Sequence, residues 1–171
     1  MSVALDVLGN FTIVKNLPQL DVDLVILPYI NPQFEKPISS RWELLEGAKY
    51  AILPQEYANL PQRLHRPSGN RVMITCGGSD LKSFTPKILK ELELVEQKLE
   101  IRAIIGPLFE NDLINEIAAL AKESRHDMKL VHAPSSLLND MLWCDIAISA
   151  SGLTKYELAS SGTPALIFSI D

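Results

Sequence analysis

Two short segments of the sequence combine small and polar residues in the way that ligand-binding loops do. Gly77-Gly78-Ser79-Asp80 follows an apolar run at residues 71–76, and Ser149-Ala150-Ser151-Gly152 follows a second run at residues 145–148. Glycine lets a ligand approach the backbone closely. A helix that starts after such a turn presents backbone N–H groups and the positive end of its dipole to an anion. The pattern of Leu153-Thr154-Lys155-Tyr156-Glu157 predicts such a helix start.

Glu157 falls on the first or second turn of this expected helix, where its carboxylate can accept hydrogen bonds from a hydroxyl-rich ligand. Together with an anion site at Ser151, Gly152, Leu153 and Thr154, it predicts binding of a phosphate that is attached to a sugar. The alternative is an ordinary helix N-terminus at which Glu157 is solvated or acts as a cap.

The segment Gly77-Gly78-Ser79-Asp80 also has two interpretations. It lines a ligand, or it is a tight turn in which Asp80 or Ser83 caps the following helix. It is not a dinucleotide fingerprint, because a third glycine at the required spacing is absent, and the chain has no Gly-Lys-Ser/Thr phosphate loop.

The histidines do not have the spacing of a metal site. His132-Ala133-Pro134 closes a predicted strand, where a ring nitrogen could face the ligand, although a lone histidine is more often structural. His65 and His126 fall in predicted surface turns. The three histidines are too scattered to share one metal ion, so we expect no metal. We also expect no cofactor, and we assign no catalytic residue.

Residues 70–171 alternate strand and helix patterns with short connections. The alternation predicts right-handed βαβ crossovers and hence an α/β fold, a Rossmann-like parallel sheet with flanking helices. Ligands bind such sheets beyond the carboxyl ends of the strands, at a topological switch point. The expected strands are residues 71–76, 101–105, 128–132, 145–149 and 165–169, and the expected helices are residues 83–94, 112–122, a segment capped by Ser135 or Ser136 that runs through Leu142, and 153–160.

Residues 1–69 have a different pattern. They contain apolar runs at residues 22–27 and 50–53, seven prolines and no long helical periodicity. We expect them to be the remnant of an N-terminal domain followed by a linker.

The composition excludes several classes of function. The 171 residues carry a net charge of −5 and no cluster of Lys and Arg, which argues against a nucleic-acid partner. No apolar run reaches the length of a membrane span. Cys76 and Cys144 lie among apolar residues and are expected to be buried free thiols in a reducing compartment, so we expect a cytoplasmic protein.

Three segments resemble one group of enzymes. Cys76-Gly77-Gly78-Ser79-Asp80 resembles the Gly-Gly-Ser/Thr-Asp loop of the nucleotide-sugar hydrolases of pseudaminic acid synthesis and of related spore-coat polysaccharide proteins. Residues 149–165 are similar to their C-terminal nucleotide-binding segment, and to that of the N-acetylglucosaminyltransferase that forms lipid II. Residues 47–57 resemble the Gly-Pro-x-Tyr-Ala-Leu-Leu-x-x-Glu-Phe stretch of the hydrolase group, which favours the hydrolase branch.

The resemblance implies two Rossmann-like domains with a UDP-sugar between them, as in GT-B folds. It implies that backbone groups near Leu153 and Thr154 hold the diphosphate and that Glu157 holds the ribose hydroxyls. It places the His132-Ala133-Pro134 turn near the uracil, and residues 77–79 beside the diphosphate or the sugar. In this family, water displaces UDP from the anomeric carbon without a metal.

The chain departs from the family pattern at both ends. The Gly-x-Gly-His loop that supplies the catalytic base of the family is absent, and the sequence stops just after the fifth expected strand. We therefore expect one half of a GT-B-like fold, incomplete at both ends, that retains the nucleotide site. Its partner is then a UDP-sugar, with self-association or a missing domain as further partners. The alternatives are a glycosyltransferase with the same donor and a non-catalytic binding or assembly module.

Overall fold

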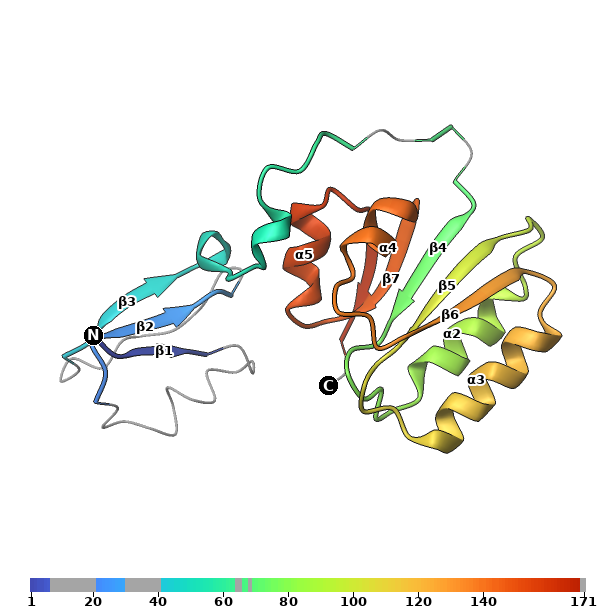
Figure 1. Cartoon of the computed structure of the whole chain (residues 1–171), viewed down its shortest axis with the longest axis horizontal. Helices are drawn as coiled ribbons and strands as arrows, with labels where there is room; N and C mark the ends of the chain where they lie inside the picture. Colours follow the sequence, from blue (N-terminus) through green and yellow to red (C-terminus); the bar gives the residue numbers. More distant parts are fainter. Residues whose placement is uncertain (7–20, 30–40, 64–65, 68, 170–171) are drawn as a thin grey trace. The chain divides into compact units, whose positions relative to one another are not determined.

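The computed structural model describes residues 1–6, 21–29, 41–63, 66–67 and 69–169. The chain divides into two compact units, Met1–Pro54 and Gln55–Asp171, each with its own parallel sheet (Figure 1). The sequence pattern places the division near residue 69, whereas residues 55–69 belong to the second unit in the structure.

The first unit contains, within the described ranges, three parallel strands in the order β1-β2-β3. They are β1 (Val3–Leu5), β2 (Leu24–Leu27) and β3 (Glu43–Glu46), and a 3₁₀ turn, η1 (Ala48–Tyr50), follows. Val25 and Leu27 of the central strand are fully buried and pack with Trp42. The apolar run at residues 22–27 thus forms a strand, but the run at residues 50–53 does not.

The second unit is an α/β Rossmann-like domain, as the sequence predicts. Its described residues form five parallel strands in the order β6-β5-β4-β7-β8. The strands are β4 (Arg71–Thr75), β5 (Glu100–Ile105), β6 (Asp127–His132), β7 (Ile146–Ala150) and β8 (Ala165–Phe168), and the helical elements are η2 (Gln55–Tyr57), α2 (Phe84–Leu92), α3 (Asn111–Glu123), α4 (Leu138–Trp143) and α5 (Thr154–Ser160).

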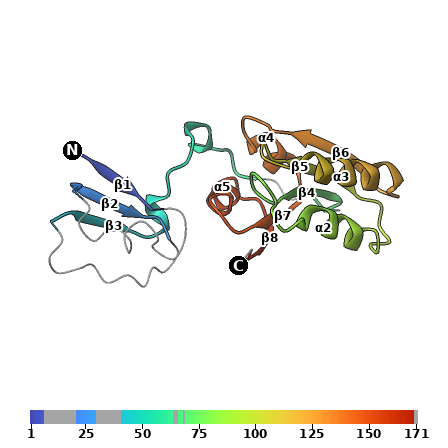
Figure 2. The same ribbon diagram turned by 90° about the horizontal axis from the view of Figure 1, so that it is seen from below.

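The direction of strand succession reverses at β4. From β4 the chain moves outward through β5 to the edge strand β6, and it then returns to pair β7 with the other side of β4. Right-handed crossovers therefore place α2 and α3 on one face of the sheet, and α4 and α5 on the other. Figure 2 shows α2 and α3 side by side.

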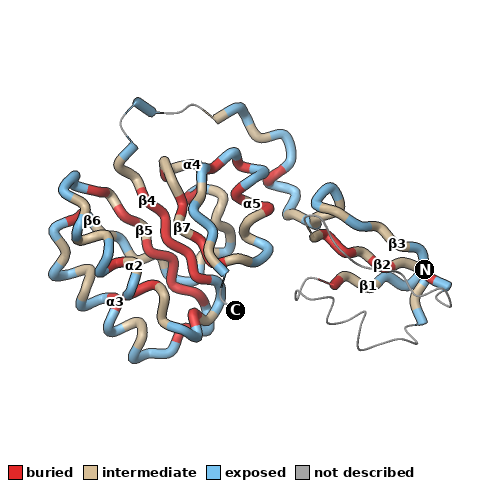
Figure 3. The backbone as a smooth tube through the Cα atoms, turned by 180° about the vertical axis from the view of Figure 1, so that it is seen from behind, coloured by how far each residue is buried: buried red, intermediate tan, exposed pale blue. Residues whose placement is uncertain are grey.

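The core lies where α2 and α3 cover the sheet. Alternate residues of β4 and β5, including Val72, Ile74 and Ile101, are buried against Leu89 and Ile117 of these helices. Figure 3 shows the buried residues concentrated in the central strands. This packing fixes the carboxyl ends of the central strands, from which the predicted ligand loops emerge.

His126 lies in a bend just before β6, but it is buried, so the prediction that it lies on the surface is wrong. Its Nδ1 accepts a hydrogen bond from the Leu99 N–H at 3.2 Å, and its Nε2 lies 2.8 Å from the Leu92 carbonyl oxygen. The neutral tautomer with hydrogen on Nε2 satisfies both contacts. The ring thus ties the end of α2 to the start of β5, a tertiary role that local sequence does not reveal.

Gly106, which follows β5, supports the loop after β4. A Cβ atom at Gly106 would lie 2.5 Å from the Gly77 carbonyl oxygen and closer still to that of Gly78. The Leu108 N–H also donates a hydrogen bond to the Gly78 carbonyl at 2.9 Å. The two turns are therefore packed backbone against backbone.

We predict that Gly106→Ala destabilises the protein by about 1–3 kcal/mol, because the added methyl group must displace the backbone of residues 77–78. Chemical denaturation measures the loss. Gly152→Ala is the matched control, since nothing lies within 4 Å of a Cβ at Gly152. Equal stability of the two variants would contradict the close packing described for Gly106.

Candidate functional site

The two predicted ligand loops start from neighbouring strands at the topological switch point. Thr75, the last residue of β4, pairs with Ser149 of β7. The segments after these residues therefore leave the sheet side by side, at the point where the strand order reverses. Gly77, Gly78 and Gly152 are exposed at this edge. In open parallel sheets, ligands bind at such a switch point, beyond the carboxyl ends of the strands.

Asp80 acts as the cap of α2. Its two carboxylate oxygens accept hydrogen bonds from the N–H groups of Phe84 and Thr85, each at 2.8 Å, and the residue is only 5% exposed. A carboxylate at a helix N-terminus also meets the positive end of the dipole. Of the two interpretations drawn from the sequence, the structure gives Asp80 the capping role. Ser83 has a left-handed backbone and makes no side-chain cap.

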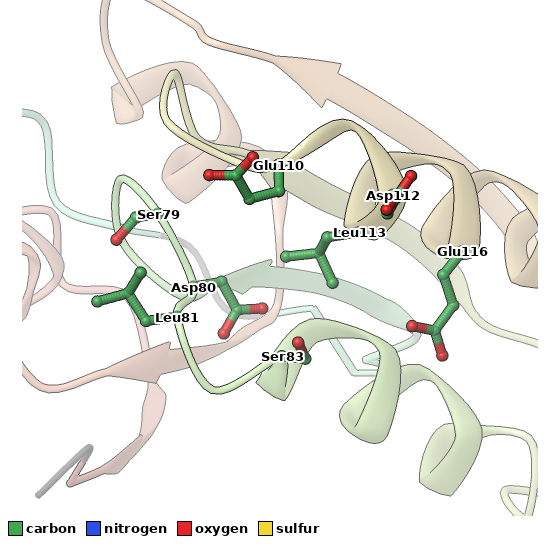
Figure 4. A pocket seen from close by; sticks show the side chains of 8 residues that line it. All are labelled: Ser79, Asp80, Leu81, Ser83, Glu110, Asp112, Leu113 and Glu116. Atoms are coloured by element: carbon green, nitrogen blue, oxygen red, sulfur yellow. The ribbon is translucent and has the colours of Figure 1, made fainter.

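Ser79 lies on the rim of a hollow of about 330 Å³ between the β4–α2 loop and α3 (Figure 4). Its lining is acidic on the α3 side, where Glu110, Asp112 and Glu116 lie. Lys90 forms an ion pair with Glu116 at 2.8 Å. The remaining negative charge disfavours a phosphate in this hollow. The β7 side of the switch point is therefore the better place for an anion.

The loop between β7 and α5 has fewer backbone N–H groups available to a ligand than the sequence suggests. The Ser151 N–H donates to the Phe168 carbonyl of β8 at 2.8 Å, so this amide extends the sheet and is not available to a ligand. Gly152 and Leu153 are exposed, and Thr154 is half-buried. α5 has only seven residues, so the contribution of its dipole is small.

Glu157, in the first turn of α5, lies beside residues of η2. Its half-buried side chain lies close to the Tyr57 hydroxyl and to the charge of Glu56. Burial and then the Glu56 charge raise the pKa of Glu157, and the nearby Tyr57 hydroxyl opposes this rise. The Ser136 hydroxyl, from the loop before α4, donates a hydrogen bond to Glu56. A carboxylate in such a setting is a candidate for a functional role.

Tyr57 is the anchor of this cluster. It is 5% exposed, and its hydroxyl lies 3.7 Å from the buried Met141 Sδ. Burial and then the charge of Glu157 raise the pKa of Tyr57 to about 12, so the phenol is a neutral donor. Sequence reasoning missed Glu56, Tyr57 and Ser136 as site residues. The available signal is the Glu-Tyr pair that ends the segment 47–57, a segment that the resemblance places outside the nucleotide site.

The His132-Ala133-Pro134 turn lies away from the switch point. His132 ends β6, an edge strand that is separated from β4 by β5, and it pairs with Ile105. His132 and Ala133 are exposed, and the Ala133 N–H donates to the Ile105 carbonyl at 2.8 Å. The turn is thus on the same carboxyl edge as the two loops but at its far end.

Two cysteines, Cys76 directly after β4 and Cys144 directly after α4, are buried free thiols. Burial raises the pKa of Cys76 to about 12 and that of Cys144 to about 11, so both are protonated at neutral pH. The described residues contain no group of three or more metal-binding side chains placed to hold an ion. No helix in the described ranges is both long and apolar enough to span a bilayer.

The chain is similar to an uncharacterized protein, MJ1062, of Methanocaldococcus jannaschii. The two are 28% identical over 128 residues, which cover 71% of this chain and 26% of the relative. The chain thus matches about a quarter of the length of that protein. No family model matches the chain.

We predict that Asp80→Ala lowers the free energy of unfolding by about 1–2 kcal/mol, because two N–H groups of α2 lose their acceptor. Urea denaturation measures the change. Asp112→Ala, which alters an exposed carboxylate of the same hollow, is the control and should change stability by less than about 0.5 kcal/mol. An Asp80→Ala variant as stable as the wild type would exclude the capping role.

Glu157 is predicted to make stability depend on pH. Its pKa is higher in the folded protein than its ordinary value of 4.5, so the folded state binds more protons than the unfolded state between those two values. The free energy of unfolding therefore falls as the pH rises through this window.

The Glu157→Gln variant should accordingly be more stable than the wild type at pH 7, and this difference should vanish below pH 4.5. Thermal unfolding at a series of pH values tests the prediction. A gap that is independent of pH would mean that burial does not perturb this carboxyl group.

Proposed function

We propose that the second unit binds a UDP-sugar at the switch point between β4 and β7, and that the protein acts in the synthesis of a surface polysaccharide or nonulosonic acid. The observation that carries the proposal is the pairing of Thr75 with Ser149, which starts two glycine-containing loops from neighbouring strands at the switch point. Exposed Gly77, Gly78 and Gly152 let a diphosphate approach the backbone.

Glu157 is the second support. It lies five residues beyond Gly152, and its side chain is half-buried rather than fully exposed to solvent. A partly desolvated acceptor gains more from a hydroxyl donor than an exposed one does. In the proposed complex, the backbone near Leu153 and Thr154 binds the diphosphate and Glu157 accepts hydrogen bonds from the ribose hydroxyls.

The proposed reaction is hydrolase-like, following the resemblance of residues 47–57 to the hydrolase branch. Water attacks the anomeric carbon and forms a new C–O bond, while the bond to the UDP oxygen breaks and UDP leaves with the electron pair. The water proton passes to a base. In the resembled family this base comes from a Gly-x-Gly-His loop, which the 171 residues of this chain do not contain.

The GT-B-like arrangement is part of the same proposal. A GT-B protein has two units, each with a parallel sheet. Each of the two units of this chain also has a parallel sheet. A transferase would use the same donor site, so the two reactions are separated by their products. Incubation with a UDP-sugar releases UDP without an acceptor only if the protein is a hydrolase.

We predict that UDP stabilises the protein and that Glu157→Ala removes the effect. At a UDP concentration ten times the Kd, the stabilisation is about 1.4 kcal/mol, which a thermal shift resolves. Amide chemical shifts should change in residues 77–79 and 152–157. Glu116→Ala, which removes a carboxylate from the acidic hollow, should leave the response intact.

No thermal or spectral response to millimolar UDP or UDP-sugars would refute the proposal. A response lost in Glu116→Ala but kept in Glu157→Ala would place the ligand in the hollow beside α3 instead.

A further inference from the structure

We propose that Arg63 is a positioning residue for the nucleotide site: it fixes the end of α5 against α4 and thereby sets the position of Glu157. The inference rests on the proposed function and deepens it, because it makes the segment before β4 responsible for how well the site distinguishes ribose from deoxyribose. Arg63 acts through the turn that joins α5 to β8, not through contact with the ligand.

α5 is too short to fix its own place in the fold. It has seven residues, and helices of this length are marginal unless tertiary contacts hold them. The position of Glu157, in the first turn of α5, therefore depends on the groups that hold the two ends of the helix. At the C-terminal end, that group is the turn formed by residues 161–163.

This turn is bonded directly to the backbone of α5. The Thr163 N–H donates to the Leu158 carbonyl at 2.9 Å, and Gly162 has a φ of 63°, as in a Schellman motif. The Ser161 N–H donates to the carbonyl of Glu157 itself, also at 2.9 Å. A displacement of the turn therefore moves Glu157 as well.

Arg63 binds this turn and α4 at the same time. Its guanidinium donates to the Thr163 hydroxyl at 3.0 Å and to the Met141 carbonyl of α4 at 2.8 Å, and it also donates to the Cys144 carbonyl. Thr163 is 6% exposed and Met141 is fully buried. Hydrogen bonds from a charged donor are among the stronger ones. Arg63 thus joins the end of α5 to the end of α4.

The hydroxyl groups at this junction need the guanidinium to take one fixed arrangement. The Thr163 hydroxyl lies 3.1 Å from the Met141 carbonyl and 2.8 Å from the Ser161 hydroxyl. A hydroxyl has one proton, so it donates to only one of these two oxygens at a time. Arg63 binds the Thr163 oxygen and the Met141 carbonyl in either case. Without Arg63, the turn loses the contact that holds it in both arrangements.

The segment that carries Arg63 is itself attached to the second unit. The Tyr57 ring is buried, and its hydroxyl lies 3.7 Å from Met141 Sδ in α4. The Tyr57 backbone carbonyl accepts a hydrogen bond from the Ser160 hydroxyl of α5 at 3.4 Å. Residues 55–63 therefore contact both helices at two places, and this anchors Arg63 well enough to position another residue.

The two ends of α5 are expected to respond differently to the loss of Arg63. A hydrogen bond weakens steeply when its acceptor moves out of line, so a ribose contact to Glu157 is sensitive to a displaced turn. In the proposed complex, the diphosphate binds near Leu153 and Thr154, at the opposite end of the helix. Arg63 should therefore affect the recognition of ribose more than the binding of the diphosphate.

The test compares the Kd values for UDP and for 2′-deoxy-UDP, measured by calorimetry on the full chain at a temperature at which every variant is folded. In the wild type, UDP should bind at least about tenfold more tightly, the worth of a hydrogen bond from a ribose hydroxyl to a charged acceptor. In Arg63→Ala the ratio should fall to about threefold or less, because this hydrogen bond is weakened.

Arg66→Ala is the matched control. The Arg66 guanidinium donates to the Trp143 carbonyl of α4 at 3.1 Å and forms an ion pair with Asp145 at 3.3 Å. Neither contact involves the turn at residues 161–163. Arg66→Ala should therefore keep the wild-type ratio, although it also removes an arginine that binds the end of α4.

Variants of Thr163 test the same contact from its other side and disturb the fold less. Thr163→Val removes the hydroxyl that Arg63 binds and should lower the ratio as Arg63→Ala does. Thr163→Ser retains a hydroxyl and should preserve the wild-type ratio. Equal ratios in these two variants would overturn the inference.

The outcomes separate the inference from the proposed function. If the wild type binds neither nucleotide, both fail. If the wild type prefers UDP and Arg63→Ala keeps that preference, the inference alone fails. A variant that weakens both nucleotides equally also overturns it, because that result assigns Arg63 a purely structural role.

Amide hydrogen exchange tests the turn without any ligand. The Thr163 amide, which donates to Leu158, should exchange at least about tenfold faster in Arg63→Ala than in the wild type, because the turn opens more readily. Arg66→Ala should leave this rate unchanged. An unchanged rate in Arg63→Ala would show that the turn is fixed without the arginine, and it would overturn the inference.

Discussion

The parallel pairing of β4 with β7 is the constraint on which the rest of the second unit depends. On one side of this pair the strands succeed each other outward from β4 to β6, and on the other side from β7 to β8. Because these crossovers run in opposite directions, α2 and α3 cover one face of the sheet while α4 and α5 cover the other. The same pairing makes β4 and β7 the strands between which the direction of strand succession reverses. The two glycine-containing loops and Glu157 take their positions from this one pairing.

Much of the second unit could be predicted from the sequence, because its elements are set by local patterns. β4 ends at a Gly-Gly pair, and α3 has a clear 3.6-residue apolar period, so both were predicted to within two residues. The first unit has one such signal, the apolar run at residues 22–27 that contains β2. β1 and β3 are short and were not predicted, since each gains its stability from pairing with β2 rather than from its own sequence.

The site was harder to predict than the fold, because its chemistry depends on contacts between distant residues. The Asp80 carboxylate could serve as a ligand-binding group, yet both of its oxygens accept hydrogen bonds from the first turn of α2. Ser151 has the position of an anion donor, yet its amide continues the sheet toward β8. In each case a backbone group of the protein forms the hydrogen bond that the sequence pattern suggested for a ligand. Only distances in the folded chain reveal this.

Tyr57 shows the converse: its signal in the sequence is only the Glu-Tyr pair that ends residues 47–57, yet the fold buries it against α4 and α5. It precedes β4, in a segment whose described residues form no strand and no long helix, and 100 residues separate it from Glu157 along the chain. Because η2 belongs to the same compact unit as α5, the Glu157 carboxylate lies among residues from both ends of this unit, and the charge of Glu56 is close enough to raise its pKa. A setting that is assembled from such distant segments cannot be recognised from the residues next to Glu157 in the sequence.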